Sequence, residues 1–264
     1  MGSPSTADHT AASAAAAAAA DTIAADDRTN NNAVSDDTVA ATLLPYWQVN
    51  VPPAERTVEC PAFLCNLSAK DRGILATPQA QAEVASWAAV RALVAANRLD
   101  AFQRTPCDLR RYLAYAWQLR QRYGSAEQFV LKERLQWSTD ETPWAPSDEP
   151  PFSHPSDVRI LCNDWPYAID PRIVHLVVWT KFPLAEDPAT GDLTPTARAA
   201  IDAFVTATFG SLPREQYVWF KNWRALKSMR QVEHFHVLVY DPPAGFVARI
   251  TDGDVPLSQR EAAG

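Results

Sequence analysis

The stretch QVEHFHVLVY, residues 231–240, decides the fold of the second half of the chain, and an Asp-Pro-Pro turn follows it. Side chains of a β-strand alternate between two faces, so His234 and His236 project from the same face of the predicted strand. Val232 and Leu238 share that face. The opposite face carries three apolar side chains, and we predict it to be the buried one: Phe235, Val237 and Val239.

Working outward, the sequence predicts three further strands and a helix before this strand. The strands cover Val158–Cys162, Ile173–Thr180 and Tyr217–Phe220, and a helix from Thr194-Pro195 to about Phe209 ends at Gly210. The second of these strands is almost continuously apolar, which is typical of a central strand. The order β-β-α-β-β predicts an α+β fold with a mainly antiparallel sheet, on which we expect the N-terminal helical part to pack.

Three helices are predicted ahead of this core. Thr77-Pro78 combines an N-cap residue with proline at the first helical position, which predicts a helix to about Asn97. Thr105-Pro106 repeats the signal for a second helix that ends at Gly124. Ser125 and Gln128 form a capping box for a third helix. Aromatic residues recur on these helices beside aliphatic ones, which favours packing in a core.

The composition divides the chain into five segments. Residues 1–42 are rich in Ala, Asp, Asn, Ser and Thr, and such a segment contains too few large apolar groups to fold, so we predict a disordered tail. Residues 43–137 form the helical N-terminal part, and residues 138–156 are a loop or linker. The α+β core covers residues 157–245, and residues 246–264 are predicted to be a frayed C-terminal tail.

Charge and composition argue against two classes of partner. The chain of 264 residues has a formal net charge of −7, which argues against nucleic acid as a general partner. No apolar run approaches the length of a membrane span, and we expect a cytoplasmic protein with no membrane partner. Gly2 and Thr6 match a myristoylation pattern, although Pro4 and the lack of a polybasic patch weaken it. The sequence sets no oligomeric state.

The sequence lacks the common motifs for binding a metal or a cofactor. A His-Glu-x-x-His motif, a phosphate-binding Walker loop, a nucleophile elbow and a dinucleotide fingerprint are all absent from the sequence. We therefore predict no cofactor and no metal. Two weaker alternatives stay open: a zinc site built on Cys60 and Cys65, and a site in which Cys162 or His175 joins the paired histidines. The four cysteines otherwise indicate reduced thiols of a cytosolic protein.

Histidine-centred phosphate chemistry fits the residues better. A neutral imidazole nitrogen can attack phosphorus, provided that nearby donors stabilise charge on the phosphoryl oxygens. Just before the His-x-His strand, one loop gathers six donor side chains on an otherwise acidic protein: Lys221, Asn222, Arg224, Lys227, Ser228 and Arg230. The alternative is an ordinary solvated loop beside two structural histidines.

Three aromatic-rich motifs resemble a known family. They are NDWPY (163–167), IVHLVVWTK (173–181) and YVWFKNW (217–223), followed by Lys227-Ser228 and VEHFHVL (232–238). The chain resembles the fungal N-acetylglucosamine-induced protein family, a domain of unknown function, over about residues 43–242. The resemblance implies a cytoplasmic fungal protein that is linked to the amino-sugar response and chitin metabolism.

A second resemblance concerns the core alone. Residues 175–181, 220–222 and 232–238 are similar to three motifs of the histidine-triad hydrolases and transferases. The resemblance implies a histidine-triad-like β-β-α-β-β core with His236 as nucleophile, His234 as its neighbour and Asn222 as a ligand contact. The sequence departs from the pattern at the third histidine, which is Leu238 here.

Two functions therefore remain open. One is an enzyme that acts on a nucleotide, nucleotide-sugar or sugar phosphate, and the other is a non-catalytic protein of the same fold that binds such a ligand or regulates a partner. The catalytic candidates are His236 and His234. The candidate ligand contacts are Asn222, Lys221, Lys227, Ser228, Arg230 and His175.

Overall fold

The computed structural model describes residues 44–137, 144–223, 229 and 231–260. The tail predicted over residues 1–42 lies outside this range, as do Lys227, Ser228 and Arg230.

A four-stranded antiparallel sheet forms the centre of the molecule. Its strands are β1 (Val158–Cys162), β2 (Ile173–Thr180), β3 (Tyr217–Phe220) and β4 (Glu233–Tyr240), in the order β1-β2-β4-β3. Helix α6 (Pro195–Phe209) connects β2 to β3. The predicted α+β class, the order of elements and the antiparallel pairing are confirmed. The last strand begins at Glu233, two residues later than predicted.

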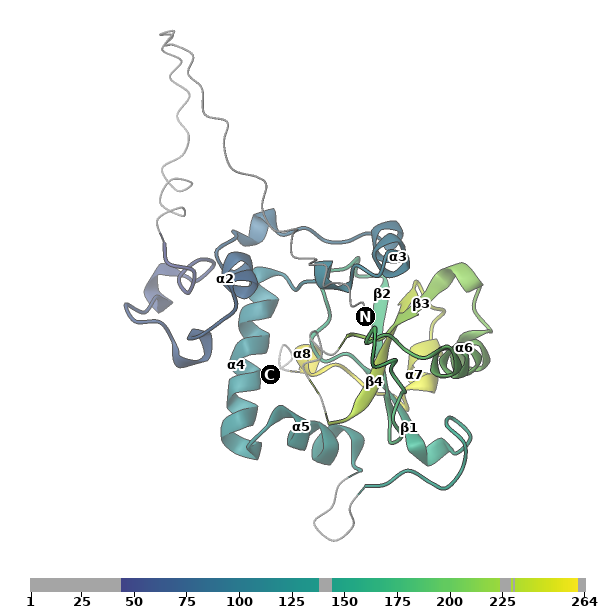
Figure 1. Cartoon of the computed structure of the whole chain (residues 1–264). Helices are drawn as coiled ribbons and strands as arrows, with labels where there is room; N and C mark the ends of the chain where they lie inside the picture. The colour runs from purple at the N-terminus through teal and green to yellow at the C-terminus, as the bar shows by residue number, and fades with distance from the viewer. Residues whose placement is uncertain (1–43, 138–143, 224–228, 230, 261–264) are drawn as a thin grey trace, which may run out of the picture.

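One face of the sheet packs against α6 and α7 (Phe246–Ile250), as Figure 1 shows. Phe235, Val237 and Val239 of β4 are fully buried there. They share an apolar cluster with three side chains of α6, namely Ile201, Val205 and Phe209. This face was the predicted buried side.

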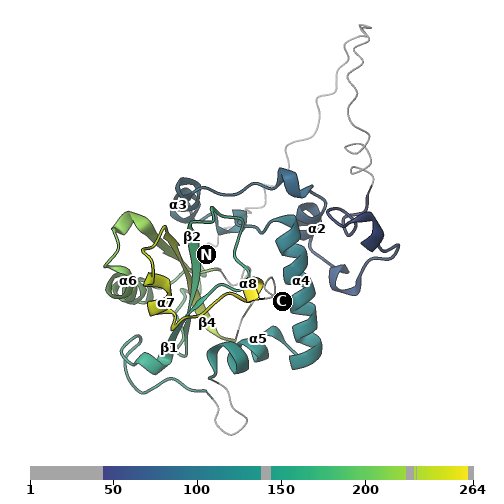
Figure 2. The same ribbon diagram turned by 180° about the vertical axis from the view of Figure 1, so that it is seen from behind.

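The histidine face is buried as well, which the sequence did not predict. Helices α3 (Trp87–Ala95), α4 (Pro106–Tyr123) and α5 (Ala126–Phe129) lie on this side of the sheet, and Figure 2 shows the two sets of helices from behind. His234 and His236 retain only 4% and 5% of their exposure. The expectation of one buried face was wrong because the N-terminal helices form a second layer over the sheet.

The helix predicted from Thr77-Pro78 to Asn97 is interrupted. A 3-10 turn η3 (Gln79–Gln81) follows the proline, and α3 begins only at Trp87, after Ser86, whose side chain accepts from Ala89 N. Between η3 and α3 the backbone is extended because Ala85 pairs with the segment 168–170. Ala85 N donates to Ala168 O, and Asp170 N donates to Ala85 O, both at 2.9 Å. Tertiary pairing therefore overrides the local helix signal.

The second and third helix signals are confirmed. Thr105 caps α4 by accepting from Asp108 N, and Gly124 ends it with a φ of +79°, which glycine adopts without strain. Ser125 caps α5, whose last turn widens into a π-helical segment η5 (Val130–Leu135). Further short elements complete the described chain: α2 (Ala69–Leu75), η1 (Pro53–Glu55), η2 (Ala62–Leu64), η4 (Leu99–Ala101), η6 (Pro155–Asp157), η7 (Arg214–Gln216) and α8 (Leu257–Arg260).

The C-terminal segment is not frayed up to residue 260, contrary to the prediction. It contains α7 and α8, and Phe246 and Thr251 are buried. Asp254 accepts a hydrogen bond from Cys162 N of β1 at 2.9 Å, and Leu257 N donates to Asp164 at 3.0 Å. These polar anchors, which alternating hydrophobicity does not reveal, hold the segment against the sheet.

Candidate functional site

A cavity of about 270 Å³ lies between the histidine face of the sheet and the N-terminal helices. His234 and His236 of β4 form part of its floor together with Asn222, which follows β3. Its walls are rich in aromatic rings, which include Tyr112, Tyr115, Phe129, Trp165, Tyr167 and Trp179. A largely apolar cavity with a few converging polar groups is typical of a small-molecule site.

A chain of hydrogen bonds crosses the floor of this cavity. Asn163 Nδ2 lies 3.1 Å from His175 Nε2, and that nitrogen lies 3.0 Å from His236 Nδ1. On the far side of the same ring, His236 Nε2 lies 3.1 Å from Asn222 Nδ2. Two imidazoles are therefore held in series between two side-chain amides.

The backbone fixes the direction of these bonds. Trp165 N donates to Asn163 Oδ1 at 2.9 Å, so the amide of Asn163 turns its NH₂ group toward His175. His175 Nε2 must then accept, and His236 Nδ1 must carry the proton that it donates to His175. His236 Nε2 is left as a lone-pair acceptor that faces the NH₂ group of Asn222.

Burial keeps both rings neutral. It lowers the pKa of His175 to about 3, and the charge of Arg104 acts in the same direction. Burial also lowers the pKa of His236 well below its ordinary value, and the neighbouring His175, His234 and Arg104 add to that effect. Neutral His236 therefore presents an unprotonated Nε2 throughout the physiological range.

This polar cluster is costly to bury. His175 Nδ1, which carries a proton in the arrangement above, finds no hydrogen-bond partner within the described part of the chain. An unsatisfied buried donor costs about 1–3 kcal/mol. Stability alone would favour an apolar residue at this position, so the cluster is a candidate functional site.

His234 is oriented separately. Its Nδ1 lies 2.9 Å from the carbonyl oxygen of Val232, so this nitrogen donates and carries the ring proton. The ring lies 4.6 Å from Trp179 and 5.5 Å from His236, centroid to centroid. Packing thus fixes both histidines of the predicted His-x-His pair beside each other in the cavity.

The third imidazole of the face comes from a different strand. His175 of β2 stands opposite Leu238 of β4 in the sheet register. Leu238 is fully buried and packs in an apolar cluster with Val90, Leu99 and Phe102. The position at which the histidine-triad pattern has its third histidine is therefore apolar, while the neighbouring strand supplies a polar partner to His236.

Arg104 is a cavity residue that the sequence reading missed. Its Nε donates to Trp165 O at 3.0 Å, and its guanidinium carbon lies 4.1 Å from the centre of the Tyr112 ring. The residue follows the turn η4 and precedes α4, far from the His-x-His strand in sequence. The Thr105-Pro106 start signal marked the helix, but no local pattern marks the residue before it.

The predicted donor loop is only partly described, and Lys221 points elsewhere. Lys221 is buried in ion pairs with Glu186 and Glu233, the latter at 3.4 Å, and lines a separate cavity of about 250 Å³. Asn222 lines both cavities. The structure therefore brings together His234, His236, His175 and Asn222, whereas Lys221 lies outside the histidine cavity and Lys227, Ser228 and Arg230 fall outside the described residues.

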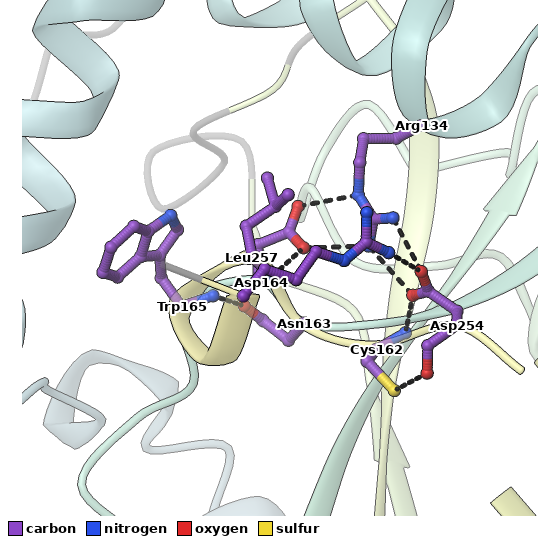
Figure 3. A network of polar contacts seen from close by, with 8 residues as sticks. Arg134, Cys162, Asn163, Asp164, Trp165, Asp254 and Leu257 are labelled. Carbon is purple, nitrogen blue, oxygen red and sulfur yellow. Dashed lines mark hydrogen bonds and ion pairs between the residues drawn. The ribbon is translucent and has the colours of Figure 1, made fainter. Parts of the chain in front are cut away.

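A buried arginine closes another part of the cavity wall. Figure 3 shows Arg134 between the carboxylates of Asp164 and Asp254, with bonds of 2.7–3.0 Å to them. Arg134, Asp164 and Cys162 all line the cavity. The network joins η5, the turn after β1 and the C-terminal segment, so it positions the wall rather than offering a free charge to a ligand.

The cysteine-based metal alternatives find no ligand set in the described residues. There, no group of three His, Cys, Asp or Glu side chains is arranged to hold a metal ion. Cys162 Sγ instead donates to Asp254 O at 3.5 Å, and burial raises the pKa of this thiol to about 11. All four cysteines are free thiols.

Within the described residues, no helix is long and apolar enough to cross a bilayer.

The fold and the cavity define an α+β protein with an antiparallel sheet that carries three clustered imidazoles beneath a helical layer. The chain belongs to the family described as "Protein of unknown function (DUF3605)", whose model matches residues 86–240. The predicted relation to the N-acetylglucosamine-induced proteins is confirmed. The chain is 26% identical over 185 residues to N-acetylglucosamine-induced protein 1 of Candida albicans, a match that covers 64% of this chain and 73% of that protein.

Two further similarities were found. The uncharacterized protein YPL067C of Saccharomyces cerevisiae is 33% identical over 118 residues, which are 44% of this chain and 59% of that protein. The solved structure described as "Crystal Structure of HTC1" is 26% identical and covers 64% of this chain and 94% of that chain, with a TM-score of 0.48.

Proposed function

We propose that the cavity binds a nucleotide, nucleotide-sugar or sugar phosphate and that His236 is the nucleophile of a phosphoryl or nucleotidyl transfer. The observation that carries the proposal is the orientation of His236. Its unprotonated Nε2 accepts from Asn222, and both residues line the cavity, while its Nδ1 proton is held by His175.

In the proposed step, the incoming phosphoryl group displaces the Asn222 amide, which donates to His236 Nε2 in the structure. The lone pair of Nε2 then attacks phosphorus, an N–P bond forms, and the P–O bond to the leaving group breaks with its electron pair. The ring becomes a cation, and His175 Nε2 accepts a stronger hydrogen bond from the Nδ1 proton. Asn222 then donates to a phosphoryl oxygen. Water or an acceptor hydroxyl breaks the N–P bond and returns the neutral ring.

A link to amino-sugar metabolism is part of the proposal. N-acetylglucosamine-induced protein 1 of Candida albicans carries this link in its name. A phosphorylated amino sugar or its nucleotide-activated form would place an anion near His236 and leave the aromatic walls to contact a ring. We propose that the protein acts in the cytoplasm in the amino-sugar response or in chitin metabolism.

One observation favours a second candidate, a binding protein without turnover. Leu238 occupies the position of the third histidine of the triad pattern and packs in an apolar cluster. On this alternative the histidine pair recognises the ligand and the protein acts in regulation.

Ligand binding and turnover can be separated in one set of experiments. Thermal shifts are measured with AMP, UDP-N-acetylglucosamine and N-acetylglucosamine 6-phosphate for the wild type and His236→Gln, each against its own ligand-free baseline. We expect stabilisation of the wild type by at least one phosphate ligand and loss of it in the variant. Equal shifts for both proteins, or none in the wild type, would contradict the role of His236.

Turnover is then tested by intact-protein mass measurement after quenching without acid, because N–P bonds are acid-labile. An adduct on the wild type that His236→Gln lacks supports the enzyme. Ligand binding by the wild type with neither adduct nor product supports the regulatory alternative.

A further inference from the structure

Among the described residues, two of the cations that line the histidine cavity lack a carboxylate partner, and Arg104 is one of them. Three cationic side chains line the cavity among the described residues: Lys70, Arg104 and Arg134. Arg134 is neutralised by two carboxylates. Lys70 is directed to the carbonyl oxygens of Asp100 and Phe102. Arg104 forms no ion pair with any residue that the structure describes, although it too lines the cavity.

Arg104 is also held in place by neutral groups. The Nε bond to Trp165 O and the stacking on Tyr112 fix the plane of the guanidinium group. The Tyr167 ring connects it with the histidines, since the guanidinium carbon lies 5.7 Å from the centre of that ring and the His175 ring lies 5.0 Å from it. A planar fork of donors of this kind matches the oxygens of a phosphate group.

The carboxylates in the cavity wall do not compensate this charge. Asp164 is paired with Arg134, and Asp71 accepts from the Ser68 hydroxyl at 2.7 Å without pairing with Arg104. The half-buried position of Arg104 reduces the screening of its charge by water. A bound anion would therefore gain an oriented cation that already lies in place.

We propose that Arg104 is the residue that holds the anionic group of the ligand and makes the cavity selective for phosphorylated over unphosphorylated ligands. The assignment rests on the proposed function and adds a specificity residue to it. Because Arg104 belongs to the N-terminal helical part and His236 to the sheet, one ligand would contact both halves of the molecule.

Binding of AMP and of adenosine, measured by calorimetry, tests this role. The proteins are the wild type, Arg104→Gln, Arg104→Lys and Arg111→Gln. Arg111 is the matched control because its guanidinium carbon lies 5.3 Å from the Trp165 ring centre, yet it does not line the cavity. We expect Arg104→Gln to weaken AMP binding at least tenfold and to leave adenosine binding unchanged. Arg104→Lys should restore part of the loss, and Arg111→Gln should resemble the wild type.

The dependence on salt gives a readout that a purely structural role would not change. AMP affinity of the wild type should fall more steeply between 50 and 200 mM salt than that of Arg104→Gln, since the removed interaction is the charged one. Equal losses for AMP and adenosine, unchanged AMP affinity in Arg104→Gln, or no AMP binding by the wild type would each overturn the assignment. If His236→Gln keeps full AMP affinity and forms product while Arg104→Gln loses that affinity, the proposed function fails and the role of Arg104 stands.

Discussion

His175 Nε2 lies 3.0 Å from His236 Nδ1, across the pair of central strands β2 and β4. Because Asn163 donates to the same His175 nitrogen, the proton between the two rings belongs to His236. We predict that long-range ¹H–¹⁵N spectra show His236 with a protonated Nδ1 and an unprotonated Nε2. The hydrogen-bond chain from Asn163 through His175 and His236 to Asn222 is called the relay below. A proton on His236 Nε2 would reverse its direction and leave that nitrogen without a lone pair.

The direction of the relay depends on the amide of Asn163. Asn163→Asp keeps the acceptor for Trp165 N but replaces the donor that faces His175 with an oxygen. We expect the proton of His236 to move to Nε2 in this variant, phosphate-ligand binding to fall, and stability to drop by about 1–3 kcal/mol.

Asn97→Asp is the control for Asn163→Asp. Asn97 Oδ1 accepts from Trp223 Nε1, and an aspartate keeps that role. Chemical unfolding and the histidine spectra are measured for both variants. A loss of the same size in both would show that the effect does not arise in the relay.

The sequence located the histidine strand but not its partners. Alternation with a period of two is a local property, so it predicted β4 and the shared face of His234 and His236. Arg104 and Asn163 reach the same cavity through tertiary packing, over sequence distances that no periodic pattern covers. Asn163 had one local signal, since its side chain accepts from Trp165 N two residues on, as in a turn.

The packing of the N-terminal helices on the sheet was predicted, but not the face that they cover. The starts of α4 and α5 were visible as caps, whereas the face on which helices pack is decided by which apolar surfaces meet. His234 and His236 look like exposed residues in an alternating strand, and only the burial of Val232 and Leu238 beside them reveals the second layer. The break of the predicted 77–97 helix has the same origin, because Ala85 pairs with a segment distant in sequence.

Acid should destabilise the protein through the buried histidines. Their pKa is lowered in the folded chain, with His175 at about 3 against 6.5 ordinarily, so below pH 6.5 the unfolded chain binds protons that the folded chain does not. Stability is therefore full above pH 6.5 and falls as the pH drops toward 5. The slope is about 1.4 kcal/mol per pH unit for each histidine once the pH is well below 6.5.

Unfolding by urea at several pH values between 5 and 7.5 measures this slope. His175→Asn should reduce the slope of the unfolding free energy against pH by the contribution of one proton. The difference in slope between the wild type and this variant separates the effect of His175 from that of the carboxylates, which titrate at lower pH. An identical slope in both proteins would show that His175 is protonated equally in the folded and unfolded chains.

The buried Arg134 network predicts a strong dependence of the C-terminal segment on one side chain. Arg134→Met leaves the buried carboxylate of Asp164 without its cation and Asp254 with only the half-exposed Arg260, and we expect a loss of about 3–5 kcal/mol in the free energy of unfolding. The matched control is Arg172→Met. Arg172 also pairs with a carboxylate, that of Asp170, but it is 59% exposed, so its loss should cost about 0–1 kcal/mol.

A third variant separates lost charge balance from lost packing. Arg134→Met combined with Asp164→Asn and Asp254→Asn removes all three charges, and we expect it to recover part of the stability because no unpaired carboxylate remains. Denaturant unfolding gives the stabilities, and limited proteolysis follows residues 254–260, which Arg134 anchors through Asp254. If Arg134→Met and Arg172→Met prove equally stable, or if the triple variant is the least stable of all, the network does not hold the segment by charge pairing.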